Sequence, residues 1–383
     1  MRKIFDAVIV GGGINGSSIA FQLAKRGYKA AVLDKGKIAG KASGAAAGIL
    51  GAQTELTEDG PLFQLACKSR SMYQSLIPEL EDLSQVHIGY QNKGVYKVAA
   101  NKEEELALKR LIEIQQKAGE QAEWLPIDSL IKLEPFVSNK LRGAMYIPND
   151  GQVQAYELSL AFAKASIAIG AEIYEYTHVI DFILKDEKVY GVRTSQGEFL
   201  ADSVIVSSGA WSREILERTG LSLPIIPVKG ECFSVKVEKP LVQGTIFSHG
   251  CYIVPKQSGR LVVGATVKVN SFDEKVTFEG ISLLMEKAQN LVPDIANTEW
   301  ERAWTGIRPQ SADGQPFLGQ HPAYEGLYIA AGHFRNGILL APATGELMAD
   351  ILEGKTEQLN PFNLSRLDCL SNRLKGCSYE CCH

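Results

Sequence analysis

AVIVGGGING, residues 7–16, is the stretch that decides the fold of this chain. It places an apolar strand directly before glycines with the spacing Gly11-x-Gly13-x-x-Gly16. In this spacing the first glycine forms a tight turn, the second lets the backbone approach a pyrophosphate, and the third packs a helix on a strand. The helix expected from Ser17 to Arg26 directs its N-terminus at the phosphates. The stretch therefore predicts a nucleotide-binding βαβ unit.

Asp34 completes this unit at the end of the second expected strand, Ala30 to Leu33, 34 − 16 = 18 residues past Gly16. An acid at that distance accepts hydrogen bonds from an adenosine ribose 2′-hydroxyl, whereas a 2′-phosphate is normally met by an arginine. The pattern favours NAD or FAD and leaves the choice open. A ligand-free strand-to-helix turn is the alternative interpretation.

Composition narrows the class of partner. The 383 residues suit two lobes, and a net charge of −4 without a basic block argues against nucleic acid or an anionic membrane surface. No apolar run approaches the roughly 18 residues that cross a bilayer, and Asp6 interrupts the only stretch like a signal peptide. We expect a soluble, cytoplasmic protein with a small-molecule ligand.

The cysteines predict neither a disulfide framework nor a metal site. Their number, seven, is odd, and four of them, Cys67, Cys232, Cys251 and Cys369, stand among apolar neighbours as buried thiols do. The remaining cysteines lie close to His383 with a spacing that fits no zinc pattern. A flexible tail over residues 365–383 accounts for them.

Residues 40–51, GKASGAAAGILG, are too rich in glycine for a stable isolated helix and too apolar for a solvated loop. Either a flat cofactor ring or another segment of the protein presses against them, and the cofactor is the favoured interpretation.

The rest of the pattern places helices, strands and lobes. Helices are expected at 61–83, 102–118, 156–169, 281–291 and 338–351, and strands at 87–90, 95–98, 172–176, 204–209, 230–237, 250–254, 261–267 and 327–332. The expected fold class is α/β: a Rossmann-like nucleotide-binding lobe built from discontinuous segments, with a second antiparallel-sheet α+β substrate lobe. The predicted segments are 1–86, 142–227 and 306–364 for the first lobe, and 87–141 and 228–305 for the second.

The motifs together resemble the D-amino-acid oxidase type of FAD-dependent oxidoreductases, and within it the bacterial glycine oxidases. The likeness extends over about residues 4–364 and rests on the Gly11 to Gly16 fingerprint, the Ser43 to Gly51 run, Asp150-Gly151-x-Val153, the 204–209 strand, Gly306-Ile307-Arg308-Pro309, Asp313-Gly314-x-Pro316 and the 331–337 turn. The resemblance selects FAD and implies that the first lobe is an FAD-binding Rossmann-like lobe of the glutathione reductase type. Because residues 309–319 contain no cysteine where sarcosine oxidases attach their flavin, the FAD should be non-covalent.

The resemblance also implies site residues. Arg308 corresponds to the carboxylate-binding arginine, Tyr252 to a tyrosine that assists it, and Arg335 to a second arginine at the site entrance. A buried structural ion pair and a core aromatic are the alternatives for the first two. The cofactor contacts implied are Gly11, Gly13, Ile14, Asn15, Gly16, Asp34, Lys35, Ala42, Ser43, Ala47, Gly48, Ile49, Val179, Gly332, His333, Phe334, Arg335, Asn336, Gly337, Ile338 and Leu339.

A helix beginning near Gly337 would aim its free N–H groups at the charge of a reduced flavin. Some glycine oxidases carry a histidine two residues before the tyrosine, whereas this chain has Gly250 there and His249 one residue earlier. We therefore assign no residue as a catalytic base and expect His249 and His333 to be structural.

The resemblance implies oxidation of glycine, sarcosine or D-alanine to the 2-oxo acid, ammonia and H₂O₂ by hydride transfer to flavin N5. It also implies that the product supplies thiamine thiazole synthesis and that the enzyme is a homotetramer. Two alternatives share the motifs: a D-amino-acid dehydrogenase that passes electrons to an acceptor other than O₂, and a non-catalytic FAD-binding protein.

Overall fold

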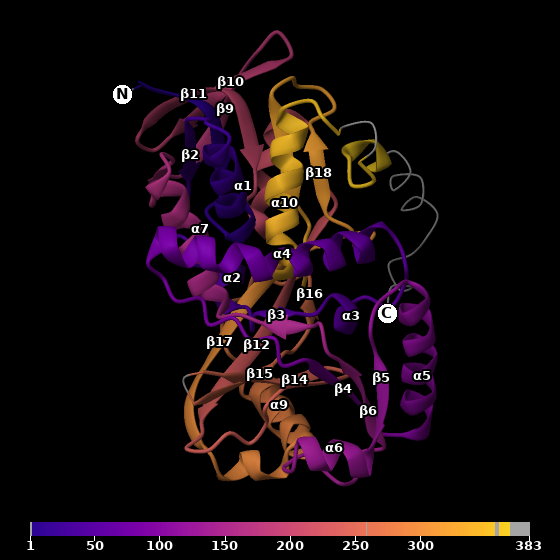
Figure 1. Ribbon diagram of the computed structural model, residues 1–383. Helices are drawn as coiled ribbons and strands as arrows, with labels where there is room; N and C mark the ends of the chain where they lie inside the picture. The colour runs from indigo at the N-terminus through magenta and orange to yellow at the C-terminus, as the bar shows by residue number, and fades with distance from the viewer. Residues whose placement is uncertain (1, 258, 357–359, 368–383) are drawn as a thin grey trace.

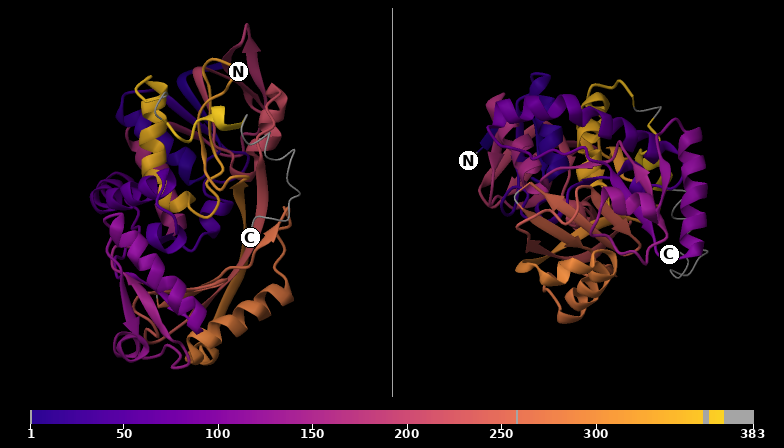
Figure 2. Two further views of the ribbon diagram at one scale, coloured as in Figure 1. Left: turned by 90° about the vertical axis from the view of Figure 1, so that its right-hand side faces the viewer. Right: turned by 60° about the horizontal axis from the view of Figure 1, so that its bottom comes forward.

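The computed structural model describes residues 2–257, 259–356 and 360–367. Two large sheets organise the chain, and Figure 1 shows the first with its helices in the upper part of the molecule and the second in the lower part. The two further views in Figure 2 show the same two-part arrangement from the side and from below.

The first sheet takes its strands from both ends of the chain: β1 (Arg2–Val10), β2 (Ala30–Leu33), β8 (Glu172–Tyr174), β9 (Val179–Lys185), β10 (Lys188–Thr194), β11 (Gly197–Val206), β18 (Phe317–Gln320) and β19 (Leu327–Ala331). Its order is β18-β19-β11-β1-β2-β8, with β10 and β9 added at β11. The central strand β1 runs parallel to β2 and β11, and β11 runs parallel to β19. Residues 7–10 are buried on both faces, as a covered parallel strand requires.

Helices α1 (Ile14–Lys25), α7 (Ala155–Ala168) and α10 (Gly337–Leu352) pack against this sheet, and α4 (Pro61–Ser84) lies across α7 and α10 (Figure 1). In α1, Phe21 meets Phe162 of α7 edge to face, with ring centroids 5.9 Å apart. On its other side, Ser18 Oγ donates a hydrogen bond to the carbonyl of Ala341 at 2.7 Å, which joins α1 to α10. These contacts place the first turns of α1 and α10 side by side.

The second sheet contains β4 (Val95–Ala99), β5 (Glu123–Pro126), β6 (Gly143–Ile147), β12 (Ile225–Lys236), β13 (Thr245–Ser248), β14 (Cys251–Lys256), β15 (Arg260–Gly264), β16 (Lys268–Val269) and β17 (Glu299–Ser311). The order is β16-β12-β15-β14-β13-β4-β6-β5, and β17 pairs along the whole length of β12. Helices α5 (Lys102–Lys117), α6 (Ile127–Leu133) and α9 (Phe278–Leu291) accompany this sheet (Figure 1).

Short elements join the two parts. They are α2 (Ala42–Ala45), β3 (Ile49–Leu50), α3 (Ala52–Glu55), β7 (Gly151–Gln152) and α8 (Ser212–Leu216). The small-residue run thus contains a short helix and a strand that pairs with β7, because neighbouring segments complete what its own sequence does not stabilise.

Two sequence expectations differ from the structure. The predicted strand at 87–90 is wrong: these residues form no strand, and the isolated pairing between Gln91 and Gln152 comes just after them. The predicted tail begins too early, because Arg366 forms an ion pair with Asp313 at 2.8 Å. The rest of that tail, with Cys369 and the cysteines near His383, lies outside the described residues.

The lobe boundaries predicted from sequence stay a proposal. Since β6 pairs with β4 and β5, sheet membership favours drawing the second boundary after β6 rather than at residue 142. The strand β17 likewise crosses from the second lobe toward the first.

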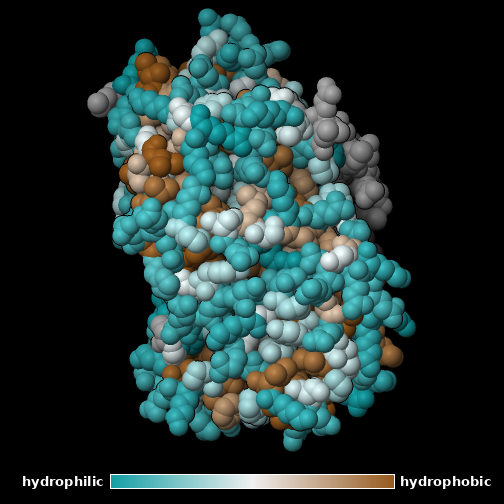
Figure 3. All heavy atoms as spheres, viewed as in Figure 1, coloured by the Kyte–Doolittle hydropathy of each residue, from teal (hydrophilic) through white to brown (hydrophobic). Residues whose placement is uncertain are grey.

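The visible face of the molecule in Figure 3 is mainly hydrophilic, with apolar side chains gathered in separate patches. In the described part of the chain, no helix has both the length and the apolar character needed to cross a membrane.

Candidate active site

A cavity of about 550 Å³ lies where the carboxyl ends of β1, β2 and β11 face β12, β14 and β17 of the second sheet. Ligands of open α/β sheets bind at this edge, because the strand ends and helix N-termini converge there. The residues predicted from sequence that line the cavity are Gly11, Gly13, Ile14, Asn15, Asp34, Lys35, Ala42, Ser43, Ala47, Gly48, Ile49, Val179, Tyr252, Arg308, Gly332, His333, Phe334, Arg335, Asn336, Gly337 and Ile338.

Two predicted contact residues are not among the lining residues. Gly16 instead serves helix packing, because a Cβ there would lie 2.0 Å from the carbonyl oxygen of Gly11. Leu339 is buried in the apolar core between α4 and α10, and its carbonyl accepts a hydrogen bond from Ser69 Oγ at 2.7 Å.

The glycine turn after β1 is shaped by its contacts. Gly11 has φ +111°, and a Cβ there would lie 2.5 Å from the carbonyl oxygen of Ser207, so only glycine fits. Asp34 is engaged on both oxygens, since it accepts hydrogen bonds from Gly12 N and from Gly36 N, each at 2.7 Å. Asp34 therefore holds two loops together at the cavity wall, beyond the ribose contact expected from sequence.

The fit of a dinucleotide can be tested at the helix ends. Neither α1 nor α10 is capped by the side chain of its own N-cap residue. In α1 the N–H of Ile14 donates to Ser43 Oγ, and the N–H groups that follow it, like those of the first turn of α10, can serve a ligand. Between them, Asn15 Oδ1 is a buried polar atom without a partner in the described structure. A ligand carrying phosphates and hydrogen-bonding ring atoms matches these groups, and the residues fit such a cofactor.

The small-residue run contacts protein on one side and the cavity on the other. Ser43 Oγ accepts a hydrogen bond from Ile14 N at 2.9 Å, which ties the run to the glycine turn. Lys256 Nζ donates to the carbonyls of Ala47 and Val153 at 2.6 and 2.9 Å, and burial lowers the pKa of this amine to about 7. Other segments of the protein therefore press against one side of the run, and the cofactor ring expected from sequence stays a prediction for the side that lines the cavity.

Arg308 lies at the cavity without an acidic partner. Its Nη1 donates to the carbonyl of Thr266 at 3.2 Å, and among the residues that the structure describes no carboxylate lies within ion-pair distance of its guanidinium. The guanidinium lies over Gly230, where a Cβ would approach it to 2.4 Å. The alternative of a structural ion pair finds no partner in the described part of the chain.

Tyr252 lies close to both arginines. Its hydroxyl is 3.5 Å from Cys232 Sγ, and burial raises the pKa of the phenol well above its usual value, so it remains a neutral donor. A Cβ at Gly264 would lie 2.5 Å from this hydroxyl, so the glycine makes room for it. Tyr252 is therefore a wall of the cavity rather than only a core aromatic.

The turn at 332–337 lies beside β17 because Phe334 N donates to the carbonyl of Pro309 at 2.9 Å. This contact brings Arg335, one residue further along the chain, to the cavity reached by Arg308. Arg335 is ion-paired: its Nε lies 3.1 Å from Oε2 of Glu55. The two arginines thus differ in charge environment.

The histidines fit structural roles in the described protein. His333 is buried, its Nε2 lies 3.0 Å from Thr344 Oγ1, and burial lowers the pKa of the imidazole to about 3. His249 is exposed and does not line the cavity, although Gly250 does.

Sequence reasoning missed several lining residues: Gly36, Lys41, Glu55, Ser207, Ser208, Gly209, Trp211, Gly230, Cys232, Phe247 and Ala265. The stretch from 207 to 209 follows β11, and the rule that ligands bind at the carboxyl ends of parallel strands would have identified it. Glu55, Gly230 and Cys232 carry no local pattern that points to the site.

The match to a family model identifies the cofactor of this chain. Residues 6–351 match the model of the FAD dependent oxidoreductase family. The chain belongs to this family. FAD is accordingly its cofactor, which closes the choice between NAD and FAD that the glycine fingerprint leaves open.

Relatives extend this assignment over nearly the whole chain. The chain is 46% identical over 370 residues to the glycine oxidase of Geobacillus kaustophilus (strain HTA426), which covers 96% of this chain and 98% of the relative. The crystal structure of glycine oxidase from Geobacillus kaustophilus matches with a TM-score of 0.92 and 45% identity, covering 95% and 99% of the two chains. The chain is also 33% identical to the bifunctional protein ThiO/ThiG of Synechocystis sp. (strain ATCC 27184 / PCC 6803 / Kazusa), over 92% of this chain and 52% of that protein.

Proposed function

We propose that this FAD-dependent oxidoreductase is an oxidase of glycine and similarly small amino acids, forming an imine that water hydrolyses to the 2-oxo acid and ammonia. The observation that carries the proposal is the guanidinium of Arg308, which lines the cavity without an acidic partner in the described protein. A planar guanidinium binds a carboxylate through two parallel hydrogen bonds. The names of the relatives support glycine as the substrate.

In this proposal Arg308 anchors the substrate carboxylate, and Tyr252 adds a hydrogen bond from its neutral hydroxyl. The hydroxyl keeps its proton because burial raises the pKa of the phenol well above its usual value. Two anchors on one carboxylate restrict how the Cα–H bond is presented, and such orientation supplies much of the rate in reactions of this kind. Bound FAD would supply a hydride acceptor at N5 and return the electrons to O₂ as H₂O₂.

We assign no base to the protein. His333 is neutral because of its burial, with a pKa of about 3, and it is held by Thr344. The described residues at Arg308 and Tyr252 include no free carboxylate, since Glu55 is paired with Arg335. The substrate amine therefore loses its proton to solvent before its Cα–H bond breaks.

The substrates next to glycine in this proposal are sarcosine and D-alanine. Ile49 and Val267 line the cavity and set the room beside Cα. The product imine or glyoxylate would feed thiamine thiazole synthesis, for which the likeness to the ThiO/ThiG protein is the support. Non-covalent attachment of FAD and a homotetramer stay predictions from the resemblance, and a cytoplasmic location stays a prediction from composition.

Anaerobic addition of glycine to the purified holoenzyme tests the proposal. We expect the absorbance of oxidised flavin to bleach with glycine and to return when O₂ is admitted, with release of H₂O₂ and ammonia. Acetate, which has the carboxylate but no amine, serves as the matched control and should bind without bleaching. Unchanged absorbance with glycine, sarcosine and both alanines would contradict an amino-acid oxidase, and bleaching without return under O₂ would indicate another acceptor.

A further inference from the structure

Three arginines line the cavity in the described structure, Arg218, Arg308 and Arg335, and of these only Arg335 is paired with an acid. Glu55 lines the cavity and lies 3.1 Å from Arg335 at both pairs of atoms, Nε to Oε2 and Nη2 to Oε1. This is the two-point geometry in which an arginine is fully occupied by one carboxylate. The side chain of Glu55 is 15% exposed and that of Arg335 is 37% exposed, so the acid is the more buried member of a pair that lines the cavity.

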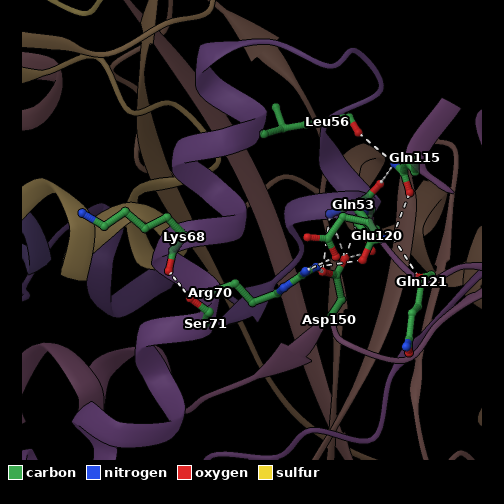
Figure 4. A network of polar contacts seen from close by, with 10 residues as sticks. Gln53, Leu56, Lys68, Arg70, Ser71, Gln115, Glu120, Gln121 and Asp150 are labelled. Atoms are coloured by element: carbon green, nitrogen blue, oxygen red, sulfur yellow. Dashed lines mark hydrogen bonds and ion pairs between the residues drawn. The ribbon is translucent and has the colours of Figure 1, made fainter. Parts of the chain in front are cut away.

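The backbone next to Glu55 is held in place from the buried side. Asp150 is fully buried and accepts hydrogen bonds from Thr54 N at 2.9 Å and Thr54 Oγ1 at 2.7 Å. Figure 4 shows Arg70 directed at Asp150 and Glu120; its Nη1 pairs with Asp150 at 2.6 Å, and the same guanidinium reaches Glu120. These contacts join α3 to α4 and to the segment after α5, so the backbone that carries Glu55 is anchored to both.

A second cation lies on the same side. Lys97 Nζ donates to the carbonyl of Thr54 at 2.9 Å, and burial lowers the pKa of this amine while the charge of Glu55 acts in the opposite direction. Glu55 therefore balances a locally positive region that includes Arg335. Without Glu55, an anion entering the cavity would find Arg308 and, in addition, an unpaired Arg335.

We propose that Glu55 determines the charge class of the substrate by occupying Arg335. Of the two arginines that the 332–337 turn and β17 bring together, only Arg308 then remains open to a carboxylate, and the enzyme accepts amino acids with a single carboxylate. A second acidic group on the substrate meets the Glu55 carboxylate, and like charges brought together in a closed site are strongly disfavoured. The proposal rests on the proposed function in taking Arg308 as the receptor of the substrate carboxylate. It makes Glu55 a specificity-determining residue and Arg335 its partner.

The test compares the affinities of acetate, malonate and succinate for the holoenzymes of the parent and of Glu55→Gln. Binding is measured by the change that each anion causes in the flavin spectrum. We expect whichever of malonate and succinate binds the parent more tightly to bind at least about tenfold more tightly to Glu55→Gln than to the parent. The affinity for acetate should change by less than about threefold. Oxidation of iminodiacetate, a dicarboxylic amine, should rise relative to glycine by a similar factor. The double variant Glu55→Gln/Arg335→Gln should lose the gain.

Glu274→Gln is the matched control. Glu274 pairs at 2.6 Å with Lys41, which also lines the cavity, so this variant removes the same charge and frees a different cation. We expect it to leave the preference for one carboxylate unchanged. An equal shift in both variants would show a general field effect and overturn the proposal, as would an unchanged preference in folded, FAD-loaded Glu55→Gln.

A further variant covers the case in which Glu55→Gln fails to fold. In Arg335→Gln the acid is left unpaired, and dicarboxylate binding should weaken by about tenfold more than acetate binding, whereas equal weakening would overturn the proposal. The binding readout separates the two hypotheses. Failure of glycine to bleach the parent contradicts the proposed function, whereas the ratio of dicarboxylate to acetate affinity tests Glu55 without any turnover.

Discussion

Replacing Gly230 by alanine should displace Arg308, the proposed anchor of the substrate carboxylate, although no charged residue is itself replaced. A Cβ at this position would lie 2.4 Å from each terminal nitrogen of Arg308 and 2.5 Å from the central carbon of its guanidinium. Atoms do not approach this closely, so the guanidinium must move by about 1 Å to restore an ordinary contact. Gly230 sits in β12 opposite Gly306 of β17, and the paired strands hold its backbone in place, so the side chain has to give way.

The size of the effect follows from this displacement. A misplacement of about 1 Å at a positioning group costs on the order of 100-fold in rate, and we expect a fall of about 30- to 300-fold in kcat/KM for glycine. Steady-state O₂ uptake with glycine measures it, and acetate binding to the oxidised holoenzyme reports the carboxylate anchor separately. Both should weaken, while the content of FAD and the thermal midpoint stay near those of the parent.

Gly319→Ala is a suitable control, because a Cβ in that strand would meet its nearest neighbour at 3.4 Å, an ordinary contact. It should leave activity and acetate binding unchanged. If folded, FAD-loaded Gly230→Ala retains kcat/KM within about twofold of the parent, the guanidinium of Arg308 does not hold the substrate in the position that the structure shows.

Three further outcomes are expected. Arg308→Ala should lose roughly 2–5 kcal/mol of carboxylate binding, about 30-fold to several thousand-fold in kcat/KM, and activity within about threefold of the parent would move that role elsewhere. Asp34→Ala should weaken FAD binding by about 1.5–3 kcal/mol, because the hydrogen bond that Gly12 N donates to Asp34 is lost together with any ribose contact. Apoprotein should then accumulate during gel filtration, and retention of FAD equal to that of the parent would exclude Asp34 from the site. The kcat/KM for glycine should rise from neutral to alkaline pH as the substrate amine loses its proton, without an inflection from histidine, because burial lowers the pKa of His333 to about 3. A flat profile, or loss of the rise in His333→Ala or His249→Ala, would make an imidazole the base.

The local pattern was sufficient for the nucleotide-binding part of the molecule. A strand, a glycine turn, a helix and an acid are specified by residues close together in sequence, and each has a conformational reason that needs no distant partner, such as the positive φ of Gly11. For the same reason α1, β2 and α10 were predicted to within a few residues, although β1 begins at Arg2, before the predicted start at Ala7. The strand expected at 87–90 failed because its apolar alternation is short and no neighbouring strand pairs with it.

The charges of the site depend on contacts between distant segments. Nothing in the sequence around Arg308 or Arg335 shows that one is unpaired in the described protein and the other is held by Glu55, since 280 residues separate the members of that pair. Gly230 is likewise an ordinary strand glycine until β17 brings a guanidinium over it. The sequence alone therefore determined the dinucleotide-binding unit, and its resemblance to a known family predicted which arginines bind a carboxylate. Only the tertiary structure decided which arginine is available, because ion pairing is set by distance in space and leaves no periodicity along the chain.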